Sequence, residues 1–558
     1  MSAKKRYNAK VLSIAFLAAL MLPVVILAFT EHNPFWVTVV GLLLPLGAYA
    51  LFAAMSHRSG RMVWLGALFL FFSAFQVVIS YLFGESVVAA DMFLNLLTTN
   101  AGEATELLGN IYPSIIAVCV IYIPILWYAA AHLRHGVVLE DSVRRGLATL
   151  GGVSLAVGCF VLWVGFPGRA KSILRDDVFP VNVCYNFCLS LSEAEKIEDF
   201  KTTSQGFSYM AQRDVEPQCR EIYVLVIGEA SRAANWQLYG YERPTNPRLV
   251  ARDDIHLFRG VTTQSNTTHK SVPMMLSSIH TSQHDELYRR SGLPALFREA
   301  GFTTYFISNQ SPQGAMIDHL ASDAHKVIYV DEPHYDAQMV EIMRKAIHTD
   351  PSPRMLFILH TYGSHFSYHQ RYPSEFTIFR PAADVAITRK NIVPIRNAYD
   401  NSVLYTDYFL SEVIKTLEKY PSISSAMLYC SDHGEDLFDN GNGRFLHSSP
   451  TVTYYQLHVP ALAWFSSGYR QNFGEKVEAA MSNIDAPATT HSVFHTMADI
   501  AAIRSPYVDC SVSLVNSKFD SAAERLYLDD HNNAVALDEE IGIDATQREL
   551  FRRAGVGL

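Results

Sequence analysis

The stretch Ile222-Tyr-Val-Leu-Val-Ile-Gly-Glu-Ala-Ser231 decides the fold of the C-terminal part of this chain. A continuous apolar run this short, closed by a glycine, is typical of a strand buried on both faces of an α/β sheet. Ligands of open α/β sheets bind beyond the carboxyl ends of the strands, so Glu229 stands where a site would lie. An acid in this place can also merely cap the next helix. Whether Glu229 belongs to a site therefore depends on which residues end the other predicted strands.

The pattern of strand, turn and helix repeats beyond residue 220, which is typical of an α/β domain with a mostly parallel sheet. The apolar runs predict strands at 222–227, 303–307, 355–359, 426–429 and 459–464. The stretches between them predict helices that include 293–300, 337–347 and 397–419. We expect one domain with one core, ending near residue 520.

The first third of the chain is apolar enough to cross a membrane several times. Hydrophobic residues make up 49% of the 558 residues and the mean hydropathy is +0.10, which is high for a soluble protein of this length. Five segments approach the roughly 20 apolar residues that a spanning helix needs, and they lie at 11–29, 36–55, 62–83, 112–131 and 147–166. The first is too long and too well followed by further spans to be a cleaved signal peptide.

The orientation of these spans follows from their basic residues. Lysine and arginine occur before the first span, between the second and third, and between the fourth and fifth, whereas the two opposite loops hold none. Loops rich in lysine and arginine stay in the cytoplasm. An odd number of spans then places everything after Gly168 outside the cytoplasm.

Charge and cysteine content exclude some classes of protein. The net charge of -9 with a pI near 6.2 argues against a nucleic-acid binder, which would present a basic face. Seven cysteines at scattered spacings form neither a zinc ribbon nor a dense disulfide framework. Cys184 is close enough to Cys188 to pair in an oxidising compartment, and Cys219 could pair with Cys510. Cys430, inside an apolar run, is predicted to be a buried free thiol.

The loop between the third and fourth predicted spans carries a polar pattern. Asn95, Thr99 and Glu103 lie four residues apart, so on a helix they would form one polar stripe. Judged by spacing alone, a solvated helix at the membrane interface is the favoured interpretation.

Most of the predicted strands end in polar side chains that can bind metal. These side chains follow the strands directly or in the next loop, and they are Glu229, Asn309, His360, His365, Asp432, His433 and His447. Each has an ordinary explanation by itself, but their convergence on one sheet edge indicates a site. Carboxylates and imidazoles without thiolates suit zinc or manganese at an open catalytic centre. The pattern predicts metal-assisted phosphoryl or sulfuryl transfer.

A nucleophile for such a transfer is expected in the hydroxyl-rich stretch 262–271, just before an apolar helical segment. A hydroxyl near a helix N-terminus is well placed, because free backbone N–H groups stabilise an alkoxide and a phosphate. The residues leave Ser265, Thr267, Thr268 and Ser271 open as candidates. A Ser/Thr helix cap is the alternative explanation.

Three blocks carry a family resemblance: Gly228-Glu-Ala-Ser-Arg232, Leu238-Tyr-Gly-Tyr-Glu-Arg-Pro-Thr-Asn-Pro247 and Ser431-Asp-His-Gly-Glu435. The chain resembles the phosphoethanolamine transferases that decorate lipopolysaccharide, including the lipid A enzymes behind polymyxin resistance. The resemblance covers the five spans and the whole C-terminal domain. It implies an α/β/α fold of the alkaline phosphatase/sulfatase superfamily behind a membrane domain of five transmembrane helices.

The resemblance assigns roles to individual residues. A threonine three residues before Ser-Val-Pro is the nucleophile in that family, and Thr268 holds this position. The residues matching the catalytic zinc site are Glu229, Thr268, Asp432 and His433. The histidines matching those around the phosphate or a second metal are His365 and His447. The positions matched to substrate binding are Asn95, Thr99 and Glu103 in the membrane loop, with Asn309, Gln313 and His360.

Three positions depart from the family pattern. The lipid A enzymes flank the nucleophile with a disulfide, where this chain has Gln264 and Met274. Their phosphate-contacting lysine is replaced here by Gln313. These departures bear on the acceptor more than on the mechanism, because the metal and nucleophile positions are intact.

The activity implied by the resemblance is transfer of phosphoethanolamine from phosphatidylethanolamine to a lipopolysaccharide acceptor, lipid A or core, through an intermediate on threonine. It implies zinc as the cofactor, with manganese as the alternative, and a monomer in the inner membrane with its catalytic domain in the periplasm. One alternative is a polyglycerolphosphate (lipoteichoic acid) synthase, and another is an inactive membrane sensor on the same fold. A sulfatase activity is disfavoured, since no Cys/Ser-x-Pro-x-Arg motif occurs around the nucleophile stretch.

We expect four regions along the chain. They are a five-span membrane domain at 1–168, a periplasmic connector with interfacial helices at 169–219, the catalytic domain at 220–520 and a C-terminal tail at 521–558.

Overall fold

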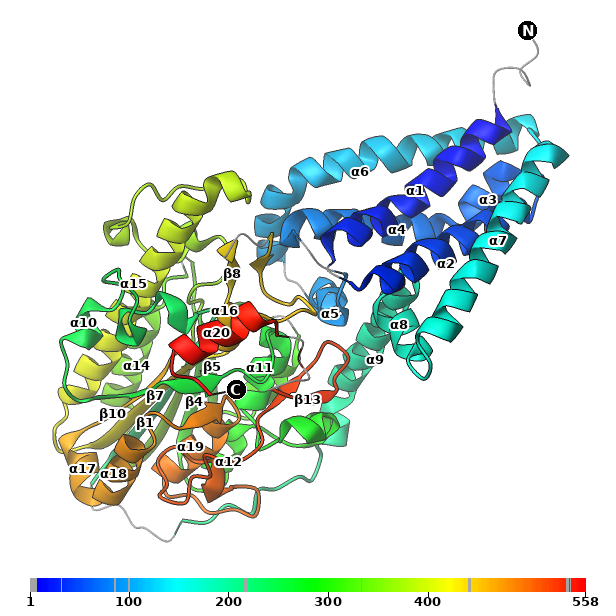
Figure 1. Cartoon of the computed structure of the whole chain (residues 1–558). Coiled ribbons are helices and arrows are strands. Elements are labelled where there is room, and N and C mark those ends of the chain that lie inside the picture. Colours follow the sequence, from blue (N-terminus) through cyan, green and yellow to red (C-terminus); the bar gives the residue numbers. More distant parts are fainter. Residues whose placement is uncertain are drawn as a thin grey trace. The chain divides into compact units, whose positions relative to one another are not determined.

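The structure is a computed structural model. It describes residues 8–31, 33–84, 87–98, 101–213, 219–312, 314–332, 334–439, 443–537, 541 and 543–557. The chain forms two compact units, shown in Figure 1. The first comprises Met1–Phe93 with Gly102–Leu191, and the second Leu94–Ala101 with Ser192–Leu558.

The first unit is helical, as its apolar composition predicts. Its helices are α1 (Ala9–Thr30), α2 (Phe35–Ala54), α3 (Ser59–Leu65), α4 (Ala67–Phe83), α6 (Ala101–His135), α7 (Asp141–Gly165) and α8 (Ala170–Asp176), while α5 (Ala90–Thr98) and α9 (Val181–Thr203) run into the second unit. Four helices among the described residues are long and apolar enough to span a membrane, and the bent pair α3–α4 makes up to five. This pair, which contains the third predicted span, bends by 61° at Gly66.

The residues of the predicted polar stripe lie on α5, on α6 and between these two helices. Asn95 is on α5, which ends at Thr98, whereas Glu103 is on α6, which begins at Ala101. Thr99, between them, lies outside the described residues. Asn100 also lies outside the described residues. The common polar face of Asn95, Thr99 and Glu103 therefore stays a prediction.

The second unit is built on a seven-stranded sheet in the order β2-β10-β7-β1-β6-β4-β5. The strands are β1 (Glu221–Gly228), β2 (Ile255–Phe258), β4 (Thr303–Ser308), β5 (Lys326–Tyr329), β6 (Arg354–His360), β7 (Ser424–Ser431) and β10 (Ala461–Phe465). The strands from β7 across to β5 pair in parallel, and β10 is antiparallel to both of its neighbours. The mostly parallel sheet is confirmed, with β1 buried along its whole length at the centre.

Further short strands form two-stranded sheets: β3 (Gly260–Thr262) with β11 (Pro487–Thr489), β8 (Asp436–Leu437) with β9 (Phe445–Leu446), and β12 (Leu526–Leu528) with β13 (Ala534–Ala536). The remaining α-helices are α10 (Pro247–Val250), α11 (Thr268–Met275), α12 (Leu293–Glu299), α13 (Met316–Ala321), α14 (Ala337–Thr349), α15 (Ile392–Glu418), α16 (Tyr454–Leu457), α17 (Ser467–Asn472), α18 (Gly474–Ser482), α19 (Ser492–Ile500) and α20 (Ala545–Arg553). Figure 1 shows these helices around the sheet.

The core of the second unit forms where helices cover the sheet. Tyr223, Leu225 and Ile227 alternate along β1 and join one buried cluster with Met275 and Leu276 at the end of α11. Burying large apolar side chains is the main favourable contribution to folding. This packing fixes the end of β1 against the helix that begins at Thr268.

The C-terminal segment is folded onto the rest of the second unit. The ring of Phe551 on α20 packs edge-on against Tyr454 on α16, with ring centroids 4.9 Å apart. The backbone N–H of Leu528 donates to the carbonyl of Gln264, 2.7 Å away. The segment beyond residue 520 thus holds the start of the loop that leads to Thr268.

Candidate active site

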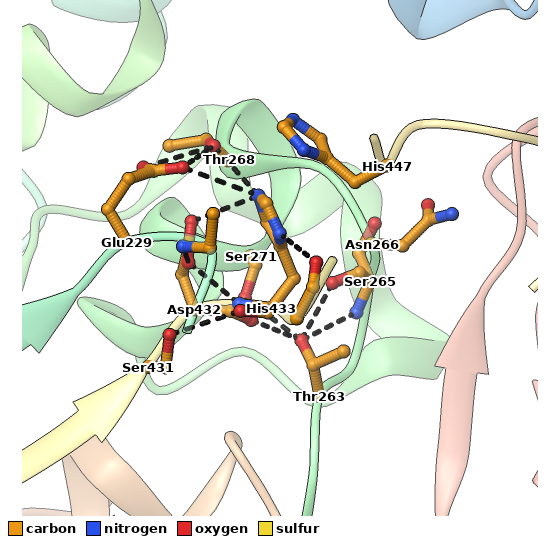
Figure 2. A network of polar contacts seen from close by, with 12 residues as sticks. Glu229, Thr263, Ser265, Asn266, Thr268, Ser271, Ser431, Asp432, His433 and His447 are labelled. Atoms are coloured by element: carbon orange, nitrogen blue, oxygen red, sulfur yellow. Dashed lines mark hydrogen bonds and ion pairs between the residues drawn. The ribbon is translucent and has the colours of Figure 1, made fainter. Parts of the chain in front are cut away.

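The carboxyl ends of the two central strands bring three metal-competent side chains together. Glu229 follows β1, and Asp432 with His433 follows β7, whose Ser431 pairs in register with Gly228. One ligand atom from each of the three lies within 4.8 Å of the others, and all three residues are buried. Figure 2 shows them facing Thr268. We call Glu229, Asp432 and His433 the triad.

Asp432 is held with one oxygen satisfied and the other free. Its Oδ1 accepts from the N–H groups of Ala230, at 3.1 Å, and His433, at 2.7 Å. Its Oδ2 is buried, has no hydrogen-bond partner and lies 3.4 Å from Nε2 of His433. A buried carboxylate oxygen without a partner is costly. A cation between these groups would satisfy Oδ2.

His433 is fixed in the tautomer that a metal requires. Its Nδ1 lies 2.9 Å from the carbonyl oxygen of Gly434, which can only accept a hydrogen bond. Nδ1 therefore carries the proton, and Nε2 directs a lone pair toward Glu229 Oε1, 3.7 Å away. A ligating histidine commonly uses its other N–H in this way.

The pKa of Glu229 is shifted by its buried and crowded surroundings. Burial and, after it, the neighbouring Asp432 carboxylate raise the pKa of Glu229 well above its ordinary value. Gln310 lowers the pKa of Glu229 by donating from Nε2 to its Oε2 at 3.0 Å. The same Nε2 also donates to the carbonyl of Thr361 at 2.9 Å. Gln310 was missed in the sequence, although it directly follows Asn309 at the end of a predicted strand.

Thr268 is the candidate nucleophile that contacts the triad. It is the first residue of α11, and its Oγ1 lies 3.0 Å from His433 Nε2 and 3.3 Å from Glu229 Oε2. Ser271, one turn later, instead donates to the backbone carbonyl of Asp432 at 2.6 Å. The hydroxyl of Thr267 is buried without a partner.

The loop before Thr268 is held by neighbouring segments. Asn266 donates through Nδ2 to Gln456 Oε1 at 2.9 Å and to the carbonyl of Ser449 at 2.8 Å. Its own carbonyl accepts from the N–H of Ser448 at 3.1 Å. The nucleophile loop and the loop carrying His447 are therefore fixed to each other.

The ring of His447 lies next to that of His433 in the triad, and its Nδ1 pairs with a further acid, Glu435. Its ring centroid is 4.0 Å from that of His433, and its Nδ1 is 3.3 Å from Oε2 of Glu435. Burial lowers the pKa of His447 to about 4. Burial also raises the pKa of Glu435 to about 8. A neutral imidazole beside a protonated carboxyl can relay a proton. Glu435 lies in the sequence block that carries the resemblance, but its pairing required the fold.

His365 lies in the loop after β6, beside Glu229. The N–H of Ser364 donates to the carbonyl of Glu229 at 2.9 Å. Burial, and then the charge of Arg371, lower the pKa of His365 well below its ordinary value. Nδ1 of His365 is buried and has no hydrogen-bond partner.

The other predicted substrate-binding residues bond to groups outside the triad or lie outside the described residues. Asn309 donates from Nδ2 to Asp336 Oδ1 at 2.7 Å, so it supports the loop after β6. His360 is buried, with Nδ1 3.2 Å from the hydroxyl of Ser308. Gln313 lies outside the described residues, and the side chain of Glu103 is not described.

The cysteines correct one part of the sequence analysis. All seven are free thiols, so both predicted pairings were wrong, while the buried thiol of Cys430 is confirmed. Cys184 and Cys188 lie four apart on α9, which separates Cβ atoms by about 5–6 Å, whereas a disulfide needs about 3.8 Å. Gln264, in place of the family's flanking cysteine, donates to Thr281 Oγ1 at 2.9 Å.

The chain matches a known protein family over the part that contains this site. The family model described as Sulfatase matches residues 221–503, which is just over half of the chain. The chain belongs to the sulfatase family. This family membership describes the fold, and the predicted superfamily is confirmed.

Several curated relatives of this sulfatase-family chain are named phosphoethanolamine transferases, as the resemblance implied. Phosphoethanolamine transferase EptA of Salmonella typhimurium is 30% identical over 314 residues, covering 52% of this chain and 54% of that protein. The Kdo(2)-lipid A phosphoethanolamine 7''-transferase of Escherichia coli is 29% identical over 283 residues, covering 48% of each chain. The chain thus spans about half the length of the curated relatives it matches.

Solved structures share the fold. Lipooligosaccharide phosphoethanolamine transferase A of Neisseria meningitidis, an integral membrane protein, matches with a TM-score of 0.71 and 23% identity, covering 91% of this chain and 98% of that chain. The periplasmic domain of Escherichia coli EptC, in complex with zinc, matches with a TM-score of 0.53 and 23% identity, covering 58% of this chain and 94% of that one. The predicted fold class, apolar helices followed by a sulfatase-like domain, is confirmed.

Replacing Gly363 by alanine should disturb the triad. Gly363 has φ +50, and an added Cβ would lie 2.7 Å from the carbonyl oxygen of Glu229. Backbone strain of this kind costs roughly 1–3 kcal/mol, so we expect a lower free energy of unfolding and weaker zinc binding. Urea denaturation and zinc titration of the full chain measure both. Gly474→Ala, where a Cβ meets nothing within 4 Å, is the control, and equal behaviour of the two variants would contradict the prediction.

Replacing Gln310 by leucine should weaken metal binding with little effect on the fold. The change removes the amide donor to Glu229 and leaves that carboxylate with the longer hydrogen bond from the Thr268 hydroxyl, at 3.3 Å. Loss of a hydrogen bond that orients a metal ligand typically costs about 10–100-fold in affinity. Competition with a chelator measures the zinc affinity. Gln370→Leu, at an exposed position, serves as the control. A Gln310→Leu chain that binds zinc as tightly as wild type would refute the role.

Proposed function

We propose that this chain transfers phosphoethanolamine from phosphatidylethanolamine to a lipopolysaccharide acceptor, lipid A or core, through a covalent intermediate on Thr268. The observation that carries the proposal is the contact of Thr268 Oγ1 with both Glu229 and His433 of the triad. The printed names of the relatives support the substrate class.

The residues present fit a zinc ion. We propose that Glu229, Asp432 and His433 hold it together with Thr268, as the free Oδ2 of Asp432 and the lone pair of His433 suggest. Bound there, zinc would supply positive charge that holds the Thr268 hydroxyl as its alkoxide and polarises the phosphate. Manganese, which also accepts oxygen and imidazole ligands, is the alternative.

In the first step, Thr268 Oγ attacks the phosphorus atom and the bond from phosphorus to the diacylglycerol oxygen breaks. His447 donates its Nε2 proton to the leaving oxygen while its Nδ1 takes a proton from Glu435, 3.3 Å away. Diacylglycerol leaves, and phosphoethanolamine stays on Thr268.

In the second step, an acceptor oxygen attacks the same phosphorus atom. His447 takes the acceptor's proton at Nε2 and returns the Nδ1 proton to Glu435. Thr268 leaves as the alkoxide, so the protein regains its starting state. His365, whose pKa is lowered in part by the charges of His433 and His447, would stabilise charge on the transferred group.

The apolar helices make physical sense for this reaction, because donor and acceptor are both lipids. We propose that these helices cross the inner membrane, that the second unit lies in the periplasm, and that the chain acts as a monomer. Asn95, Thr99 and Glu103 would contact the lipid substrate, and Asn309, Gln313 and His360 would line its headgroup site.

A phosphoethanolamine adduct should form on the wild-type chain and be absent from Thr268→Ala. Intact-mass measurement after incubation with phosphatidylethanolamine tests this, with Thr267→Ala as the control that keeps the adduct. An adduct that persists in Thr268→Ala would contradict the nucleophile assignment. Incubation with phosphatidylglycerol is the second arm, and a glycerophosphate adduct in place of phosphoethanolamine would indicate a polyglycerolphosphate synthase.

A further inference from the structure

The helix that carries Thr268 begins without a side-chain cap. Its N-cap residue is Thr267, whose hydroxyl is buried and has no hydrogen-bond partner in the described part of the chain. The first N–H groups of a helix lack partners within it, so an uncapped first turn frays more easily. Thr268 is the first residue of this turn, and fraying would move its hydroxyl away from the triad. Contacts from other segments are therefore needed to hold the turn.

Lys270, in the same first turn, adds a further cost. The residue is only 5% exposed, and a positive charge near a helix N-terminus opposes the helix dipole. Its Nζ donates to the carbonyl oxygens of Asp529, at 3.1 Å, and Asp530, at 3.3 Å. A buried ammonium needs such acceptors. Lys270 therefore ties the first turn of α11 to the segment that supplies them.

The two carbonyls lie in the turn of the hairpin that β12 and β13 form. Asp529 closes this turn, because its Oδ1 accepts from the N–H groups of His531, at 2.9 Å, and Asn533, at 2.7 Å. The carbonyls that meet Lys270 are thus presented by a hydrogen-bonded turn. The hairpin lies beyond residue 503, where the match to the family model ends. Membership of the sulfatase family therefore does not account for it.

Strand β12 of the same hairpin holds the chain on the other side of the nucleophile. The hydroxyl of Tyr527 accepts from the N–H of Asn266, two residues before Thr268, at 3.3 Å. The ring of Tyr527 is buried in a cluster with apolar side chains of α16 and α20, which fixes the place of its hydroxyl. The hairpin therefore binds the chain both before Thr268, at Asn266, and after it, at Lys270.

We propose that the hairpin at residues 526–536 is a clamp that positions the nucleophile, with Lys270 and Tyr527 as positioning residues that act through Thr268. This inference rests on the proposed function, in which Thr268 attacks the phosphorus atom. Lys270 holds the first turn of α11, and Tyr527 holds the loop before it. The hydrogen bonds that define the clamp involve no ligand of the proposed zinc site. The clamp therefore sets the rate of attack and leaves zinc binding by the triad unchanged.

The first test follows adduct formation on the full-length, zinc-loaded chain with phosphatidylethanolamine, in single turnovers read by intact mass. Misplacing a reacting group by about 1 Å can cost about 100-fold in rate, so Lys270→Met should lower the rate constant by about 10–100-fold. Tyr527→Phe, which removes one weaker hydrogen bond, should lower it by about 2–10-fold. In both variants the half-saturating lipid concentration and the zinc affinity should stay as in wild type.

Two further variants distinguish positioning from loss of any lysine. Lys270→Arg keeps a cation with N–H donors, so it should recover part of the rate that Lys270→Met loses. Lys419→Met removes a lysine at an exposed position and should react like wild type.

The second test needs no substrate and measures amide hydrogen exchange of the full-length chain. Exchange of an amide follows the free energy of its local opening. Lys270→Met and Tyr527→Phe should therefore exchange faster than wild type in the segment 264–271. The central strand β1 should keep its wild-type exchange in both variants and serves as the internal reference.

The outcomes separate the clamp from the proposed function. Variants that bind zinc like wild type and also form the adduct at its rate would overturn the clamp. Faster exchange in β1 as well as in 264–271 would overturn it too, because lost stability would then explain the slower reaction. A wild type that takes no adduct from phosphatidylethanolamine would reject the proposed donor. Faster exchange confined to 264–271 in the variants would then still support the clamp, and unchanged exchange there would overturn it.

Discussion

The structure depends on the close approach of two buried carboxylates, Glu229 and Asp432. Like charges this near in a buried setting are strongly unfavourable unless a cation or a proton lies between them. The fold nevertheless forces the approach, because β1 and β7 are adjacent parallel strands and each ends in one of these acids. His433 adds a lone pair to the same point, and Thr268 adds a hydroxyl. A divalent cation bound there would relieve the repulsion between the two carboxylates, and its charge would assist the proposed transfer.

The surrounding backbone is shaped to hold this arrangement. Ala230 has φ 51, so the chain turns sharply after Glu229 and aims its N–H at Asp432. Gly434 follows His433 where a Cβ would lie 1.9 Å from the carbonyl oxygen of Tyr455. The positive φ of Ala230 stores local strain at the site, and Gly434 allows the close approach of the Tyr455 backbone. Hydrogen bonds from Asn266 and from the C-terminal segment hold the loop that leads to the nucleophile.

Much of this could be predicted from the sequence, because the central strands are short apolar runs ended by glycine or by polar residues. Glu229, Asp432 and His433 lie at those ends, so their convergence followed from the geometry of parallel sheets. The strand β5 was missed because half of its residues are exposed and it begins with Lys326. The contact from Gln310 to Glu229 joins positions 81 residues apart, and no local pattern marks it.

The most direct test of the central claim is to locate zinc in the full-length chain loaded with one equivalent of the metal. Anomalous diffraction at the zinc edge gives the position, and X-ray absorption gives the ligand atoms. We predict one peak between Glu229, Asp432 and His433, with oxygen and a single imidazole at about 2.0–2.1 Å and no sulfur. A zinc–sulfur distance near 2.3 Å, or a peak away from these three residues, would contradict the account.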